Sequence, residues 1–190
     1  MVPALIEVLQ AVPEWRGRQG MRYPLPGVLA LVCLALLSGC NQVREIARWG
    51  QERRWGLSRR LGFKPGRMPS EASLRRVLAG VNVAVLAAQM QVWVEAVLAG
   101  LGKEVRQVAV DGKRLRGSVL AGHEHAVVNA LAHPLGVVLG QATIPAGGSE
   151  QGTMAALLEA MVLEGRVVTL DALPTHRQTA TGVREKKAIT

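Results

Sequence analysis

The 190-residue sequence has few aromatic residues: one Phe, one Tyr and four Trp. Hydrophobic residues nevertheless make up 49% of the chain, so the core must be built mostly from Leu, Val, Ala and Met. A chain of this length can bury one substantial core, or a small domain beside a second one. With 19% charged residues, the chain lacks the composition of a disordered protein.

Cysteine is also scarce, with Cys33 and Cys40 as the two examples. Two thiols are too few for a disulfide scaffold, and their spacing is not that of a familiar zinc knuckle. The simplest interpretation is a protein kept reduced in the cytoplasm.

One apolar run imitates a targeting signal but is too short to span a membrane. Residues 28–40, VLALVCLALLSGC, imitate a bacterial lipoprotein signal that would be lipidated at Cys40. The run starts after prolines at 24 and 26, and it is shorter than the roughly 20 residues that a bilayer requires. A buried helix and no membrane partner are therefore expected, and a lipoprotein anchor is the rival hypothesis.

Acidic residues are outnumbered: 23 Lys and Arg face 14 Asp and Glu, for a formal net charge of +9. Residues 44–76 alone hold ten cations and three acids. Such a basic block predicts a polyanionic partner, either nucleic acid or a membrane surface. The alternative is a solvated face that only keeps the protein soluble.

The first hundred residues have helical patterns. We expect a helix over 27–38 that is buried on every side, and a helix over 42–49 capped by Asn41. A connecting arm over 50–69 should follow, then a helix started by Ser70 and ended by Gly80. Asn82 should cap a helix that runs to about Leu98. Short arginine-bearing helices of this kind permit a helix-turn-helix relative, although many helical bundles share the pattern.

After residue 102 the pattern changes to strands. We expect strands over 105–111, 125–133 and 136–146, the last two forming an antiparallel hairpin. A helix over 152–165, ended by Gly165, and a strand over 166–172 should follow. The predicted fold class is therefore α+β, with an all-helical domain over residues 1–100 and a mixed-sheet domain over 101–190.

The chain contains only two aspartates, and each one ends a β-branched apolar strand: VAVD at Asp111 and VVTLD at Asp171. A helical crossover favours a last strand parallel to a neighbour in the sheet. If that neighbour is the first strand, both carboxylates emerge at one rim, where α/β sheets place ligands.

Two carboxylates at that spacing repel each other unless a cation lies between them. Magnesium prefers such oxygen ligands, and two ions can flank a phosphodiester. The alternative is structural: Asp111 pairs with Lys113 or Arg114, and Asp171 caps a local turn. The residue pattern leaves both alternatives open.

Several stretches together resemble a known family. VAVDGKRLRGS, HAVVNALAHPLGVVLGQ and VVTLDALPTHRQTA occur in the order found in bacterial insertion-sequence transposases of the ISAs type, the group that includes the H-repeat-associated proteins. SGCNQVREIARWG and PSEASLRRVL resemble the helical domain associated with that family. The likeness covers about residues 25–180.

The resemblance implies a DDE transposase with a ribonuclease H-like core, which binds transposon-end DNA and performs metal-dependent cleavage and strand transfer. It assigns catalysis and binding of Mg²⁺ or Mn²⁺ to Asp111 and Asp171. Contacts with DNA are expected from Lys113, Arg114 and Arg116, and from Arg75 and Arg76 in the helical domain. Intact transposase or a second copy of the chain could be a further partner.

The sequence departs from the family at its end. The family's third acid, a glutamate, has no match here, and Glu150, near a position that is often acidic, has no assigned role. We therefore expect a truncated chain with little strand transfer of its own, which leaves its status as an enzyme open. The alternative is a non-catalytic DNA-binding remnant that regulates transposition.

Overall fold

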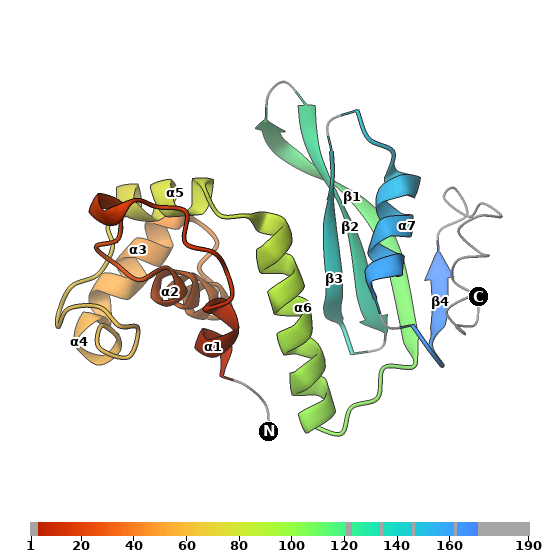
Figure 1. Cartoon of the computed structure of the whole chain (residues 1–190), viewed down its shortest axis with the longest axis horizontal. Coiled ribbons are helices and arrows are strands. Elements are labelled where there is room, and N and C mark those ends of the chain that lie inside the picture. The colour runs from red at the N-terminus through yellow and green to blue at the C-terminus, as the bar shows by residue number, and fades with distance from the viewer. Residues whose placement is uncertain (1–3, 121–122, 134, 146, 162, 171–190) are drawn as a thin grey trace. The chain divides into compact units, whose positions relative to one another are not determined.

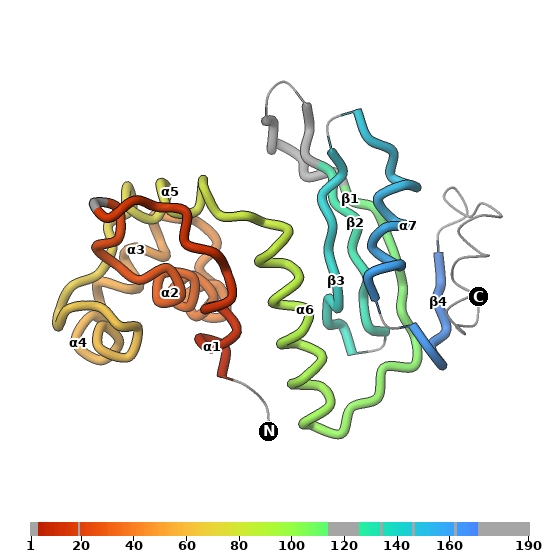
Figure 2. The backbone as a smooth tube through the Cα atoms, viewed as in Figure 1, coloured from red at the N-terminus to blue at the C-terminus, as the bar shows by residue number. Residues whose placement is uncertain are grey.

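The structure is a computed structural model of the whole chain (Figure 1). It describes residues 4–120, 123–133, 135–145, 147–161 and 163–170, without the side chains of Gln19, 114–120 and 123–125. The chain divides into two compact units, Met1–Trp93 and Val94–Thr190. The path of the backbone shows helices in the first unit, and strands with one covering helix in the second (Figure 2).

The first unit is helical. It contains α1 (Leu5–Leu9), a 3-10 turn (Arg18–Gly20), α2 (Leu25–Leu37), α3 (Val43–Glu52), α4 (Arg54–Leu57), α5 (Glu71–Ala79) and the start of α6 (Val83–Gly100). Its core is aliphatic and centres on the fully buried Leu9, Leu31 and Leu74. The paucity of aromatic residues in the sequence is therefore matched by a core of Leu, Val, Ala and Ile.

Close approach of α2 to the following loop depends on Gly27. A Cβ atom at this position would overlap the carbonyl oxygen of Leu61 and lie 2.8 Å from the Phe63 ring. Any larger residue would therefore push α2 away from a segment 34 positions later in the chain. This contact explains why a glycine interrupts the otherwise bulky apolar run of α2.

Several predictions for the helical unit are confirmed, and others are wrong. Ser70 caps α5, its Oγ accepting the N–H of Ser73 at 3.3 Å. Helix α2 is not buried on every side, because Leu36 and Leu37 at its end are 51% and 79% exposed. The predicted arm over 50–69 is partly helical, because it contains the end of α3 and all of α4.

The predicted cap of α3 is also wrong. Gln42, rather than Asn41, is the cap residue, and the Glu45 carboxylate accepts the backbone N–H groups of both residues at 3.0 and 3.1 Å. A carboxylate reaching back from the first turn satisfies the free donors of a helix start as well as a capping side chain does. The helix therefore starts one residue later than the Asn pattern indicates.

The second unit is a mixed four-stranded sheet with one covering helix. Strands β1 (Gln107–Leu120), β2 (His123–His133) and β3 (Val137–Ile144) are antiparallel neighbours. After α7 (Glu150–Ala160), β4 (Val167–Leu170) pairs in parallel with β1, which gives the order β3-β2-β1-β4. This is the predicted α+β architecture and the strand order expected for part of a ribonuclease H-like sheet.

The core of this unit lies between the sheet and α7. Val108 and Val110 of β1 and Val128 of β2 pack with Met154 and Leu158 of the helix. Helix α7 ends at Ala160 rather than near Gly165, because Met161 is already extended (ψ 151°). Met161 and Leu163 are both buried in this core. Packing thus overrides the helical period of the sequence, and Gly165, with φ at +73°, lies in the turn before β4.

Helix α6 is the one described helix that is long and apolar enough to cross a membrane by length and composition. Its 18 residues extend about 27 Å, slightly less than a typical hydrocarbon core. Leu86 and Met90 pack against the core of the helical unit, and Val94 and Leu98 belong to the core of the sheet unit. These contacts cover part of its apolar surface, and Val83 and Val92 remain 58% exposed.

Candidate functional site

Asp111 lies on β1 and is exposed. Its neighbours Val108 and Val110 are buried under α7, so the alternation of a strand directs Asp111 to the opposite face of the sheet. Among the side chains that the structure describes, none forms an ion pair with Asp111, and Lys113 is exposed without reaching it. The structural alternative in which Lys113 neutralises Asp111 is therefore not formed.

The strand that leads to the second aspartate lies directly beside β1. Val108 pairs with Val168, and Val110 pairs with Leu170 in a parallel register. Val110 and Leu170 are the residues that immediately precede Asp111 and Asp171 in the sequence. The predicted parallel neighbour is confirmed, whereas Asp171 itself lies outside the described residues.

A polar row crosses the sheet from Asp111. Asp111 is the register partner of Asn129 on β2, and Asn129 is the partner of Gln141 on β3. The Gln141 side-chain amide donates to Asn129 Oδ1 at 2.8 Å. That hydrogen bond fixes Asn129 beside the carboxylate. Sequence patterns alone did not single out these two amides, although each lies between apolar or small residues of its strand.

Glu150, the first residue of α7, occupies the other face of β1. Its carboxylate lies directly over Gly112, where a Cβ atom would overlap Oε1. Because Gly112 follows Asp111, alternation along the strand places Glu150 and Asp111 on opposite faces. Glu150 therefore lies beside the residue that follows Asp111, but it faces the opposite side of the sheet.

The donors near Asp111 fit a hard metal ion in chemistry but are few. An exposed carboxylate that no described side chain pairs with, and an amide oxygen, are the kinds of ligand that Mg²⁺ accepts with water. The described residues contain no group of three or more His, Cys, Asp and Glu that could hold a metal ion. A metal here would therefore need Asp171 or a bound phosphate to complete its coordination.

The five predicted DNA contacts differ in how free they are. Arg75 is held by Glu71 at 2.8 Å, whereas the Nε of Arg76 donates to the carbonyl of Ala72 at 3.3 Å and its side chain lines a surface cavity. Lys113 is exposed on β1. The side chains of Arg114 and Arg116 lie outside the described residues. The structure thus leaves Arg76 and Lys113 available, and engages Arg75.

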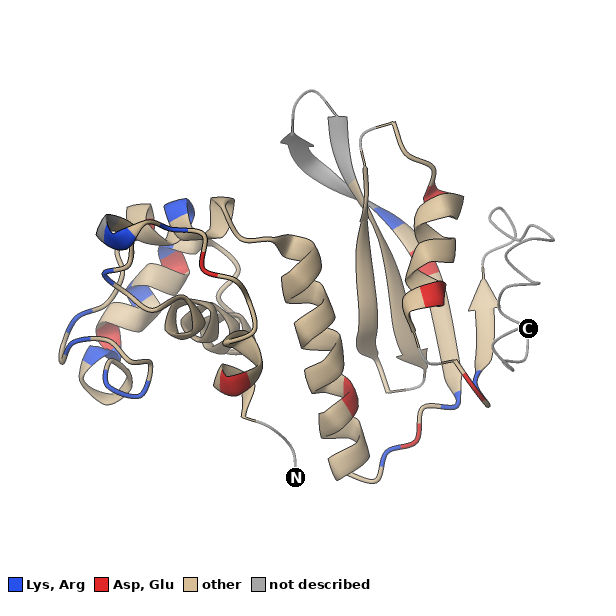
Figure 3. Cartoon of the chain, in the orientation of Figure 1, with Lys and Arg blue, Asp and Glu red and all other residues tan. Residues whose placement is uncertain are grey.

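Positive charge concentrates in the helical unit (Figure 3). Met1–Trp93 holds 13 of the 23 Lys and Arg but 5 of the 14 Asp and Glu, a net charge of +8. The sheet unit holds the remaining ten cations and nine acids, a net charge of +1. The electrostatic attraction of this chain for a polyanion therefore comes almost entirely from the helical unit.

Comparison with known proteins agrees with this division. The family model described as DDE_Tnp_1-associated matches residues 6–94, which are the helical unit. "Putative transposase YncI" of Escherichia coli K12 is 26% identical over 190 residues, covering 98% of this chain and 75% of that protein. The chain is a homologue of putative transposases along nearly its whole length.

Two further relatives are much longer proteins than this chain. The YncI protein of E. coli O157:H7 is 26% identical over 98% of the chain, and "H repeat-associated putative transposase YhhI" of E. coli K12 is 23% identical over 96%. The chain spans 48% of the length of each of these two proteins. No solved structure matches it. The resemblance to the H-repeat-associated group is thereby confirmed.

Proposed function

We propose that this transposase homologue binds DNA through its helical unit, and that its sheet supplies Asp111 and Asp171 to metal-dependent phosphodiester cleavage and strand transfer. One observation carries the catalytic part. The parallel pairing of Val110 with Leu170 brings together the residues that immediately precede the chain's two aspartates. Continuing that register by one residue would place both carboxylates on one face of the sheet.

The chain's own residues would act by position and charge. Asp111 and Asp171 would hold the metal, while Asn129, fixed by Gln141, would orient Asp111 or a metal-bound water. Magnesium or manganese, when bound, supplies the charge that activates an attacking oxygen and stabilises a leaving oxygen. Lys113, on the same face as Asp111, would attract the DNA backbone toward the carboxylates.

Mn²⁺ binding to the full chain, followed by electron paramagnetic resonance, tests the catalytic part. Asp111→Asn and Asp171→Asn should each weaken Mn²⁺ affinity by at least about tenfold, because even outer-shell groups are typically worth that much. Glu150→Gln, which removes a carboxylate from the opposite face of β1, is the matched control and should leave the affinity unchanged. An equal loss in all three variants would contradict a site shared by the two aspartates.

A second function is favoured by the concentration of charge in the helical unit: DNA binding without catalysis, as a regulator of transposition. Duplex binding measured across salt concentrations tests the part common to both functions. The logarithm of affinity should fall linearly with the logarithm of salt, by about 0.9 per phosphate neutralised. A salt-independent affinity would contradict DNA binding, whereas duplex binding without cleavage in Mg²⁺ or Mn²⁺ would favour the regulator.

A further inference from the structure

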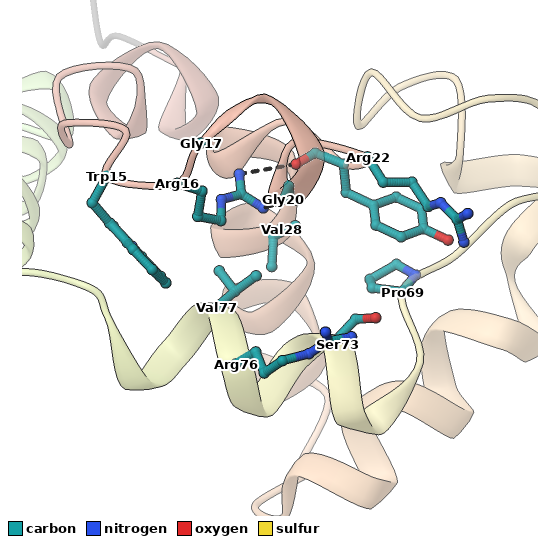
Figure 4. Close-up of a pocket in the computed structure, with 11 residues that line it drawn as sticks. Trp15, Arg16, Gly17, Gly20, Arg22, Val28, Pro69, Ser73, Arg76 and Val77 are labelled. Atoms are coloured by element: carbon teal, nitrogen blue, oxygen red, sulfur yellow. Dashed lines mark hydrogen bonds between the residues drawn. The ribbon is translucent and has the colours of Figure 1, made fainter.

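The helical unit contains a cavity of about 530 Å³ that none of the predicted catalytic residues lines (Figure 4). The Trp15 ring, 49% exposed, forms one side and supplies apolar surface, and Val28 of α2 and Val77 of α5 line the wall with 0% and 6% exposure. Ser73 and Arg76 reach it from α5. Its volume lies within the range of small-ligand sites, and its lining combines an apolar surface, an aromatic ring and hydrogen-bond donors.

A second hollow of about 160 Å³ shares two lining residues, Arg22 and Tyr23, with the first, and the two hollows together are called the double cavity. Lys64 and Arg67 complete it, so three cations surround a small space. Within the described part of the chain, no carboxylate pairs with any of these three cations. Three unpaired cations at one hollow repel one another, and an anion would relieve that repulsion.

The walls of this double cavity are held in place. Tyr23 Oη donates to the carbonyl of Met68 at 2.8 Å, and its ring meets Phe63 edge to face with centroids 5.1 Å apart. The Trp15 ring lies against Gly80, which leaves no room for a Cβ atom there. The aromatic walls are therefore positioned before any ligand arrives.

Arg16 has a structural role beside the cavity rather than a free charge. Its guanidinium binds the Glu14 carboxylate at 2.6 Å and donates to the carbonyls of Tyr23 and Gly20 at 3.0 and 3.2 Å. The same hydrogen bonding lowers the pKa of Glu14 below its ordinary value. Arg16 thus ties the loop that carries Trp15 to Tyr23. The cations that remain for ligand binding are Arg22, Lys64 and Arg67.

The chemistry of the two hollows together matches one nucleotide. A phosphate fits a small space among three cations, and a base fits a larger cavity with an apolar surface beside an aromatic ring. A base stacked within a duplex could not enter such a concave site, because it is covered by its neighbours on both faces. An unpaired base can, as single-strand binding sites illustrate.

We propose that this double cavity binds one unpaired nucleotide of DNA, with its phosphate at Arg22, Lys64 and Arg67 and its base against the Trp15 ring. The proposal rests on the proposed DNA-binding function and adds a single-strand site to it. Arg76 and Ser73 are placed to donate hydrogen bonds to the edge of the base. Duplex phosphates would be bound by the exposed cations elsewhere on the helical unit.

Fluorescence anisotropy of the full chain with labelled oligothymidylate and with a labelled duplex tests the site. Lys64→Ala/Arg67→Ala should lower single-strand affinity about tenfold more than Arg44→Ala/Arg59→Ala does. That control removes the same charge from exposed positions of the same unit. Ser73→Trp should fill the larger hollow without changing charge, so it should reduce single-strand binding and spare duplex binding. Circular dichroism establishes that each variant is folded.

Three results are distinguishable. Loss of single-strand affinity in both cavity variants, beyond the control, supports the site. Equal losses in the two double variants, or full single-strand binding by folded Ser73→Trp, would overturn the site while duplex binding upholds the proposed function. Binding of neither DNA by the unmodified chain would overturn the proposed function and the site together.

Discussion

The two units of the chain differ in how completely their acidic residues are engaged. In the helical unit all five glutamates are engaged locally: Glu7 and Glu45 accept backbone N–H groups at helix starts, and Glu14, Glu52 and Glu71 pair with arginines. In the sheet unit, Asp111 is exposed with no ion-pair partner among the described side chains. The difference indicates where each unit is prepared for a ligand.

This contrast follows from charge balance. Three of the five glutamates in the helical unit neutralise nearby arginines, so most of the unit's cations form a surplus without a carboxylate partner among the described side chains. In the sheet unit cations and acids are nearly equal in number, so an unpaired carboxylate there is not a consequence of composition. A surplus of cations suits a polyanion, and a free carboxylate suits a cation, which are the two ligands of a metal-dependent enzyme acting on DNA.

The largest expected effect comes from core substitutions, which test whether the two units unfold independently. Leu74→Ala and Met154→Ala each truncate a fully buried side chain, one in each core. Each should cost about 2–5 kcal/mol, through lost burial and the cavity left behind. Amide hydrogen exchange should show Leu74→Ala weakening protection in α2 and α3, and Met154→Ala weakening protection in β1 and β2.

Each substitution is the control for the other, because they match in burial and in kind. If either variant lowers protection in both units by the same amount, the two cores unfold as one. Helix α6, which contributes residues to both cores, would then be the element that couples them. The division into two units would remain a description of contacts but not of stability.

Sequence patterns predicted the order of elements because local signals and the tertiary fold agree there. The apolar stretches that lead to Asp111 and Asp171, and the crossover helix between them, were enough to predict a parallel pair. The predicted strand end at Asp111 was wrong, because pairing with β2 continues β1 through Asp111 to Leu120. Patterns failed where packing decides. Helix α7 stops at Ala160 although its apolar period continues, because Met161 and Leu163 are needed in the core as extended chain.

The features near the candidate sites were harder to predict for a geometrical reason. Asn129 and Gln141 become significant only when the register aligns them with Asp111. The double cavity is built from residues as distant in sequence as Arg22, Lys64 and Arg76. No local pattern links these positions, so only the folded chain shows that they gather. Composition did predict where positive charge concentrates, because a net charge can be counted without knowing the fold.

A smaller effect is expected from the cap of one helix in each unit. Ser70 and Ser149 both cap helices with Oγ, accepting Ser73 N–H at 3.3 Å in the helical unit and Gly152 N–H at 2.9 Å in the sheet unit. Replacing either by Ala should cost about 1 kcal/mol, because one backbone donor loses its partner. The shorter bond predicts the larger loss for Ser149→Ala, measured by urea unfolding with Ser→Gly at each site as the control.

Glycine should recover most of the stability, since it is nearly as good a cap residue as serine. A Ser70→Ala variant as costly as Ser149→Ala would mean that the Ser70–Ser73 hydroxyl contact of 3.1 Å, which has no counterpart described at Ser149, contributes as much as the cap itself.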